Sequence, residues 1–128
     1  MEEIAKIAAP LMVLERRPWA FSGAGSLAAL GALSGLVFAS IENLLYFFVY
    51  LDEYGPGLLA WRLVVCTLLH VGCSLLCGIG LGRAWRKAER KRTTASLASA
   101  RAWIIAAMVI HGLYNAAACF WQVATRST

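Results

Sequence analysis

Five polar side chains, three of them able to transfer protons or bind a metal, lie inside strongly apolar stretches of the sequence. They are Glu42, Asn43, His70, His111 and Asn115. Ionisable and strongly polar residues are costly within a membrane and usually face the interior of a helix bundle or a water-filled cavity. His111 and Asn115 are four residues apart and therefore share one helix face, as do Phe38 and Glu42. Each of the five is thus a candidate functional residue.

The positions of these residues within their segments predict that they lie at one depth. With a rise of about 1.5 Å per helical residue, Glu42 lies about 14 Å and His70 about 20 Å from the outer end of its segment. His111 and Asn115 lie about 14 to 20 Å from the opposite end of theirs. We therefore predict that the side chains of Glu42, His70, His111 and Asn115 converge on one polar pocket.

Composition indicates that the surroundings are lipid. The chain has 128 residues, of which 60% are hydrophobic and 15% charged, and its mean hydropathy is +0.66. Soluble domains carry about 25% charged residues. The net charge of +5 is concentrated in residues 82–92, between two apolar runs, which favours a juxtamembrane loop over a nucleic-acid-binding face. The four cysteines lie in apolar runs, where they are expected to pack rather than form disulfides.

Four apolar segments are expected to form helices. The segment 4–14 is short, whereas 22–51, 57–81 and 102–121 reach the roughly 20 residues needed to span a bilayer. We predict an all-α integral membrane protein: a bundle of three full transmembrane helices plus one short N-terminal half-helix, in one domain over residues 1–128. Frequent Gly and Ala residues predict close helix packing.

Basic residues predict the orientation of the chain in a plasma membrane. Arg16, Arg17 and the loop 83–101 should be cytoplasmic, because positively charged loops stay on that side. The acidic turn at 52–57 should face the other side. The lipid bilayer is therefore one partner, and no nucleic acid is expected.

The same residues also have structural explanations. A membrane histidine can serve only to hydrogen-bond two helices, and Asn43 can bond to a neighbouring backbone. Glu42 can pair with Arg62, although Arg62 lies near the end of its helix and is expected to point outward. The opening "EEIAK" fits acids at a helix N-terminus and a pair between Glu2 and Lys6, four residues apart. Their joint occurrence at one depth favours a functional site.

Four motifs, in order along the chain, carry a family resemblance. They are "EEIAK" (2–6), "FASIENLLY" (38–46), "LLHVGCSLLCGIGLG" (68–82) and "HGLYNA" (111–116). The first is unspecific by itself, whereas the combination is specific and covers nearly the whole chain. The chain resembles the PrsW family of intramembrane proteases, within the wider superfamily of CAAX-prenyl proteases and bacteriocin-processing enzymes.

The resemblance implies a membrane-embedded peptidase that cleaves membrane-anchored proteins such as anti-sigma factors. The residues it implicates in catalysis are Glu2, Glu3, Glu42, His70, His111 and Asn115. In one scheme Glu42, His70 and His111 bind Zn²⁺, and Glu2 or Glu3 acts as general base. In a metal-free scheme a glutamate activates water, His70 or His111 shares the proton, and Asn115 stabilises the oxyanion. Both schemes remain open at this point, and no other cofactor is expected.

Three other functions are compatible with parts of the pattern. Histidines on two membrane helices can ligate a b-type haem, but haem leaves Glu42 and Asn115 without a task. A small exporter of the multidrug-resistance type uses one membrane glutamate and needs no paired histidines. An inactive relative would bind a partner without cleaving it.

The start of the chain carries a further expectation. Counting back from Arg16 at about 1.5 Å per residue places Glu2 and Glu3 about 20 Å into the membrane, where a charged amino terminus is costly. Relatives carry membrane helices ahead of this motif. We therefore expect an N-terminally shortened version of a longer protein, or a second subunit, for instance in a homo-oligomer, that covers the gap.

Overall fold

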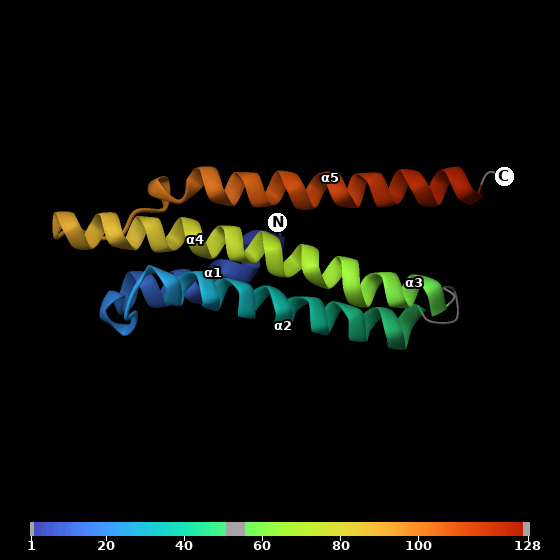
Figure 1. Ribbon diagram of the computed structural model, residues 1–128, viewed down its shortest axis with the longest axis horizontal. Helices are drawn as coiled ribbons and strands as arrows, with labels where there is room; N and C mark the ends of the chain where they lie inside the picture. The colour runs from blue at the N-terminus through green and yellow to red at the C-terminus, as the bar shows by residue number, and fades with distance from the viewer. Residues whose placement is uncertain (1, 51–55, 127–128) are drawn as a thin grey trace.

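The structure is a computed structural model that describes residues 2–50 and 56–126, and these ranges are helical with short connections and contain no strand (Figure 1). The long helices are α1 (Glu2–Arg16), α2 (Ala24–Tyr50), α4 (Thr67–Lys91) and α5 (Arg101–Arg126). A short helix α3 (Pro56–Trp61) and a π-helical segment η3 (Arg62–Cys66) precede α4. Two 3₁₀ turns, η1 (Pro18–Ala20) and η4 (Leu97–Ser99), lie in the connections.

The expected all-α membrane architecture is confirmed. Three helical stretches are long and apolar enough to cross a membrane: Ala24–Val49, Pro56–Lys91 and Arg101–Gln122. The second is one continuous helix of 36 residues that joins α3, η3 and α4. Of the acidic turn expected at 52–57, residues 52–55 lie outside the described ranges, and Pro56 and Gly57 begin α3.

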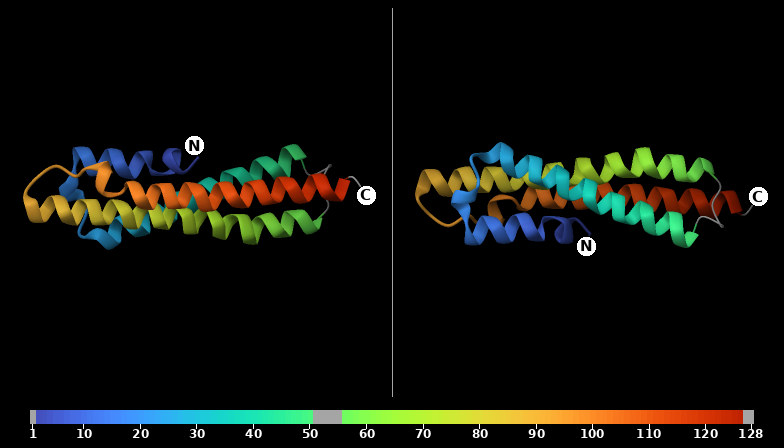
Figure 2. Two further views of the ribbon diagram at one scale, coloured as in Figure 1. Left: turned by 90° about the horizontal axis from the view of Figure 1, so that it is seen from above. Right: turned by 90° about the horizontal axis from the view of Figure 1, so that it is seen from below.

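Helix α1 is the predicted short helix, and it has 15 residues. It starts midway along the bundle and runs to the end where α4 and α5 are joined, as both views of Figure 2 show. Its first turn, with Glu2 and Glu3, is therefore level with the middle of the long helices. The middle of the bundle is where α1 can contribute acidic side chains.

Glycines allow α2 and α4 to pack closely at the level of His70. A Cβ atom at Gly35 would lie 2.6 Å from the carbonyl oxygen of His70 and 2.8 Å from Oγ of Ser74. A Cβ atom at Gly78 would lie 2.5 Å from the carbonyl oxygen of Leu27. Real side chains do not fit at such distances, so any larger residue would separate the helices. The expectation of close packing through small residues is met here, and it places His70 directly beside α2.

A proline inside α1 attaches this helix to α2. Pro10 has no backbone N–H, so the carbonyl oxygen of Lys6 loses its usual partner one turn later. The hydroxyl of Ser34 on α2 donates to that oxygen at 2.5 Å. The carbonyl oxygen that lacks a partner within α1 is thus used to link α1 to α2. This link is made by the backbone of Lys6 itself.

Candidate active site

Six titratable side chains from four helices meet in the middle of the bundle. Helix α1 supplies Glu2, Glu3 and Lys6, and α2, α4 and α5 supply Glu42, His70 and His111. The rings of His70 and His111 have centroids 4.7 Å apart and stand nearly perpendicular. The structure therefore brings together five of the six residues implicated by the sequence.

His111 is held between the two acids of α1. Its Nδ1 atom lies 2.8 Å from Oε1 of Glu3, and its Nε2 atom lies 3.6 Å from Oε2 of Glu2. Glu3 is buried, whereas 45% of the Glu2 side chain is exposed. A carboxylate on Nδ1 fixes the orientation of an imidazole and leaves Nε2 to act as an acceptor or ligand. Glu3 thus orients His111, and Glu2 is the acid that a ligand can reach.

Lys6 links Glu3 to His70. Its Nζ atom donates to Oε1 of Glu3 at 2.5 Å and lies 2.7 Å from Nδ1 of His70. An ammonium group only donates, so Nδ1 of His70 is the acceptor and the proton of a neutral ring is on Nε2. The expected pair between Glu2 and Lys6 is wrong: Lys6 pairs with Glu3, because Glu2 turns toward His111.

Glu42 lies on the other side of His70 and is paired. Its Oε2 atom is 2.7 Å from Nε2 of His70, and its Oε1 atom is 3.1 Å from Nη2 of Arg62. The expectation that Arg62 points outward is wrong, since only 14% of its side chain is exposed. The guanidinium lies 3.3 Å from the centre of the Tyr46 ring. A carboxylate and an aromatic face together compensate a buried cation better than either does alone.

The π-helical segment that begins with Arg62 was not predicted. Such segments are rare and are frequent at functional sites, because an extra residue in one turn shifts the face on which side chains emerge. Nε1 of Trp61, just before it, donates to Oη of Tyr114 on α5 at 2.8 Å. Sγ of Cys66, at its end, is 3.3 Å from the same hydroxyl. The segment is thus tied to α5 where Arg62 turns toward Glu42.

Three further residues of the motifs lie around the cluster. The Phe38 ring is 5.6 Å from the His70 ring, and Nζ of Lys6 lies 4.8 Å from the centre of the Phe38 ring. Asn43 is buried and its Nδ2 atom donates to Oγ1 of Thr67 at 3.0 Å, so it joins α2 to α4. Asn115 is exposed and makes no hydrogen bond or ion pair within the described ranges. A catalytic role of Asn115 therefore remains a prediction.

Lys6 and Arg62 were missing from the predicted site. Lys6 follows Glu3 by three residues and lies at almost the same depth, so the depth argument applied to Glu2 and Glu3 could have included it. Arg62 has a weaker signal, a basic residue inside an apolar run near its outer end. Its inward direction depends on the π-helical segment and on Tyr46, and neither is visible in the hydropathy pattern.

Three side chains of the cluster are grouped as metal ligands would be, although the two ring nitrogens of one of them, His70, also contact Lys6 and Glu42. One ligand atom from each of Glu2, His70 and His111 lies within 4.8 Å of the others. Two imidazoles and a carboxylate are a donor set of catalytic zinc, which keeps a further position open. The Oε2 atoms of Glu2 and Glu3 are buried without a hydrogen-bond partner among the described residues, as expected where a cation or water can enter. The sequence analysis predicted Glu42, His70 and His111 as the zinc ligands. In the structure Glu2, and not Glu42, is grouped with the two histidines.

Haem ligation does not fit this geometry. The two imidazole rings are in direct contact, with centroids 4.7 Å apart, so a porphyrin cannot pass between them. In addition, Nε2 of His70 faces Glu42 and Nδ1 of His111 faces Glu3. Both histidines are therefore committed to one polar cluster.

Comparison with known proteins assigns the family. No curated protein and no solved structure gives a significant match to the chain. A family model described as PrsW family intramembrane metalloprotease matches residues 1–127. The match spans nearly the whole chain. The chain therefore belongs to the PrsW family of intramembrane metalloproteases.

Proposed function

We propose that this chain is an endopeptidase that hydrolyses peptide bonds of membrane-anchored proteins at the cluster around His70 and His111. The observation that carries the proposal is the meeting of two buried histidines with acids from α1 at mid-depth in the bundle. Cleavage of a peptide bond needs an activated water, a base that accepts its proton and positive charge near the developing oxyanion. The cluster offers a group for each task.

Glu2 and His111 are the groups proposed to handle the proton. Glu2 is the most exposed acid of the cluster, so water and substrate can reach it. Nε2 of His111 faces the same carboxylate, because Glu3 occupies Nδ1. A proton taken from water by Glu2 can pass to His111 and from there to the leaving amine. Glu3 acts as a positioning residue in this scheme.

Lys6 and His70 form the second half of the proposed centre. Lys6 is fully buried, and its ammonium lies between Glu3 and His70. A fixed cation in a water-poor site stabilises developing negative charge more strongly than one in solvent. Glu42, which is itself paired with Arg62, holds Nε2 of His70 from the far side and so fixes the ring relative to Lys6.

A metal fits the same proposal. Zinc would be held by Glu2, His70 and His111, where it would displace Lys6 from Nδ1 of His70, and it would supply a bound water of lowered pKa. In that case Glu3 and Glu42 hold the two imidazoles, as carboxylates commonly do behind metal-bound histidines.

The proposed substrate rests on the family, and the proposed orientation of the chain in the membrane rests on its charge. We propose a plasma-membrane protein whose basic loop 83–101 is cytoplasmic, because basic loops are retained on that side. The substrate would be a protein with one membrane span, of the kind to which anti-sigma factors belong. Such a helix must unwind locally before a peptide bond can enter the cluster.

The test is cleavage of a single-pass membrane protein in proteoliposomes by the purified chain, with and without a chelator. The wild-type protein should cleave, and His111→Ala should not. Val109→Ala is the matched control, because Val109 is exposed on the same helix and outside the cluster. Loss of cleavage with chelator and recovery with Zn²⁺ would support the zinc scheme. Equal cleavage by His111→Ala would overturn the proposed centre.

A further inference from the structure

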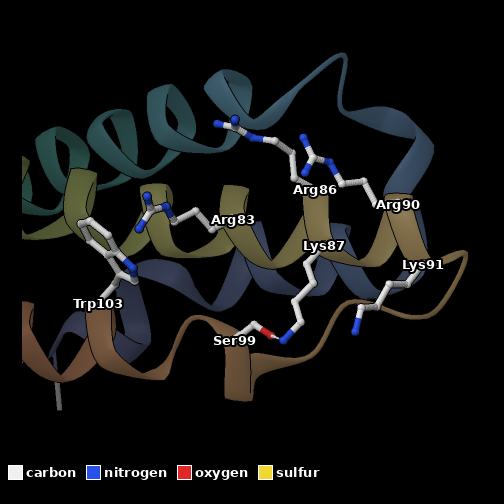
Figure 3. A pocket seen from close by; sticks show the side chains of 7 residues that line it. All are labelled: Arg83, Arg86, Lys87, Arg90, Lys91, Ser99 and Trp103. Carbon is white, nitrogen blue, oxygen red and sulfur yellow. Dashed lines mark hydrogen bonds between the residues drawn. The ribbon is translucent and has the colours of Figure 1, made fainter.

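A second polar site lies at the end of α4, away from the candidate active site. It is a cavity of about 540 Å³ lined by five basic residues: Arg83, Arg86, Lys87, Arg90 and Lys91. Ser99 and Trp103, before and within the first turn of α5, complete the lining. Figure 3 shows Lys87 and Lys91 on the side of Ser99, and Arg86 and Arg90 on the opposite side of α4.

The basic side chains of this cavity have few partners among the described residues. Among the described residues, none of the five basic side chains makes a salt bridge. Lys87 donates to Oγ of Ser99 at 3.3 Å, and the guanidinium of Arg83 lies 5.0 Å from the centre of the Trp103 ring. Five like charges on the last turns of α4 repel one another and create a strongly positive potential. An anion bound there would relieve that repulsion.

The length of the helix places the cavity at the surface of the membrane. The stretch Pro56–Lys91 has 36 residues and is therefore about 54 Å long, whereas the hydrocarbon core is about 30 Å thick. The apolar part of this helix ends near Leu81, so Arg83 and the residues after it lie among the lipid headgroups. Trp103 fits the same level, because tryptophan is enriched at membrane interfaces.

We propose that this cavity binds the phosphate group of an anionic phospholipid. Guanidinium and ammonium groups are the side chains that bind phosphate oxygens best, and arginine can do so with two parallel hydrogen bonds. Basic pockets between membrane helices are suited to anionic headgroups. The proposal does not depend on peptidase activity.

The test uses the purified full chain in detergent and measures bound lipid by native mass spectrometry. The probes are phosphatidylglycerol, phosphatidylcholine and inorganic phosphate. The test variant is Arg86→Gln with Arg90→Gln, because neither side chain makes a hydrogen bond or ion pair with another residue in the described ranges. The matched control is Arg16→Gln with Arg17→Gln, which removes the same charge from exposed residues at the same end of the bundle.

We expect phosphatidylglycerol to bind the wild-type protein and phosphatidylcholine to bind much more weakly. The pocket variant should lose about tenfold or more in affinity for phosphatidylglycerol, and the control variant should not. Equal losses in both variants would overturn the proposal, since they would show a general effect of charge. Inorganic phosphate that competes fully at millimolar concentration would reassign the site to a free anion. If the double variant does not purify, the single variants give the same comparison.

Discussion

Oε1 of Glu3 lies 2.8 Å from Nδ1 of His111, although 108 residues separate the two along the chain. The same oxygen accepts a hydrogen bond from Lys6 at 2.5 Å. Glu3 therefore connects the first turn of the chain with α5 and compensates the charge of a buried lysine. Because its side chain is only 2% exposed, water cannot take over either interaction.

Glu3→Gln should destabilise the protein by about 3 kcal/mol, because it leaves Lys6 as a buried cation without its carboxylate. The measurement is the free energy of unfolding in mixed detergent. The control is the double variant Glu3→Gln with Lys6→Met, which removes both charges and should recover much of the loss. A double variant that is as unstable as Glu3→Gln alone would show that the ion pair is not the cause.

Glu42 and Arg62 should be energetically coupled. A carboxylate without a partner is costly within a membrane, so replacing an unpaired Glu42 by a neutral residue would stabilise the protein. The structure pairs Glu42 with Arg62 and His70, and Nε of Arg62 has no hydrogen-bond partner in the described ranges. Glu42→Gln should therefore destabilise, and a double-mutant cycle with Arg62→Gln should give a coupling energy of about 1 to 3 kcal/mol. Additive effects would refute the pair.

The approach of α2 to α4 should depend on Gly35. Gly35→Ala places a Cβ atom against the carbonyl oxygen of His70, and it should cost about 1 to 3 kcal/mol and displace the histidine. Gly25→Ala on the same helix meets open space and should be neutral or stabilising by up to about 1 kcal/mol. Thermal unfolding of the two variants side by side measures the difference. Equal stability would mean that the helices can separate without loss.

Metal content should distinguish the two proposed ligand sets. The structure groups Glu2 with His70 and His111, so Glu2→Gln should abolish zinc binding measured by elemental analysis of the purified protein. Glu42→Gln removes only a carboxylate behind His70 and should weaken zinc binding by about 10- to 100-fold. The reverse pattern would restore the ligand set of Glu42, His70 and His111 expected from the sequence.

Much of the site could be predicted because membrane depth can be calculated from sequence. A helix rises uniformly, and a bilayer fixes its ends, so Glu42, His70 and His111 could be placed at one level before their contacts were known. The same argument placed Glu2 and Glu3 at that level. Depth determines which residues can meet, and here it was sufficient for five of the six candidates.

The rotation of each helix could not be predicted in the same way. Asn115 shares a helix face with His111 by spacing, yet it is exposed. Arg62 turns inward because of a π-helical segment, which hydropathy does not reveal. Adjacent residues point about 100° apart on a helix, so the rotation of α1 decides whether Glu2 or Glu3 faces Lys6. Such choices are made by tertiary contacts.

Turnover of Glu2→Gln per folded molecule tests most directly whether the cluster is a catalytic centre. Nearly half of the Glu2 side chain is exposed, so this change should leave folding almost intact. We predict that cleavage of a single-pass membrane substrate falls by about 100-fold or more, as expected on loss of a general base. Glu15→Gln, an exposed acid at the other end of α1, should keep the wild-type rate. A folded Glu2→Gln protein with wild-type turnover would contradict the account and leave the cluster with a structural role.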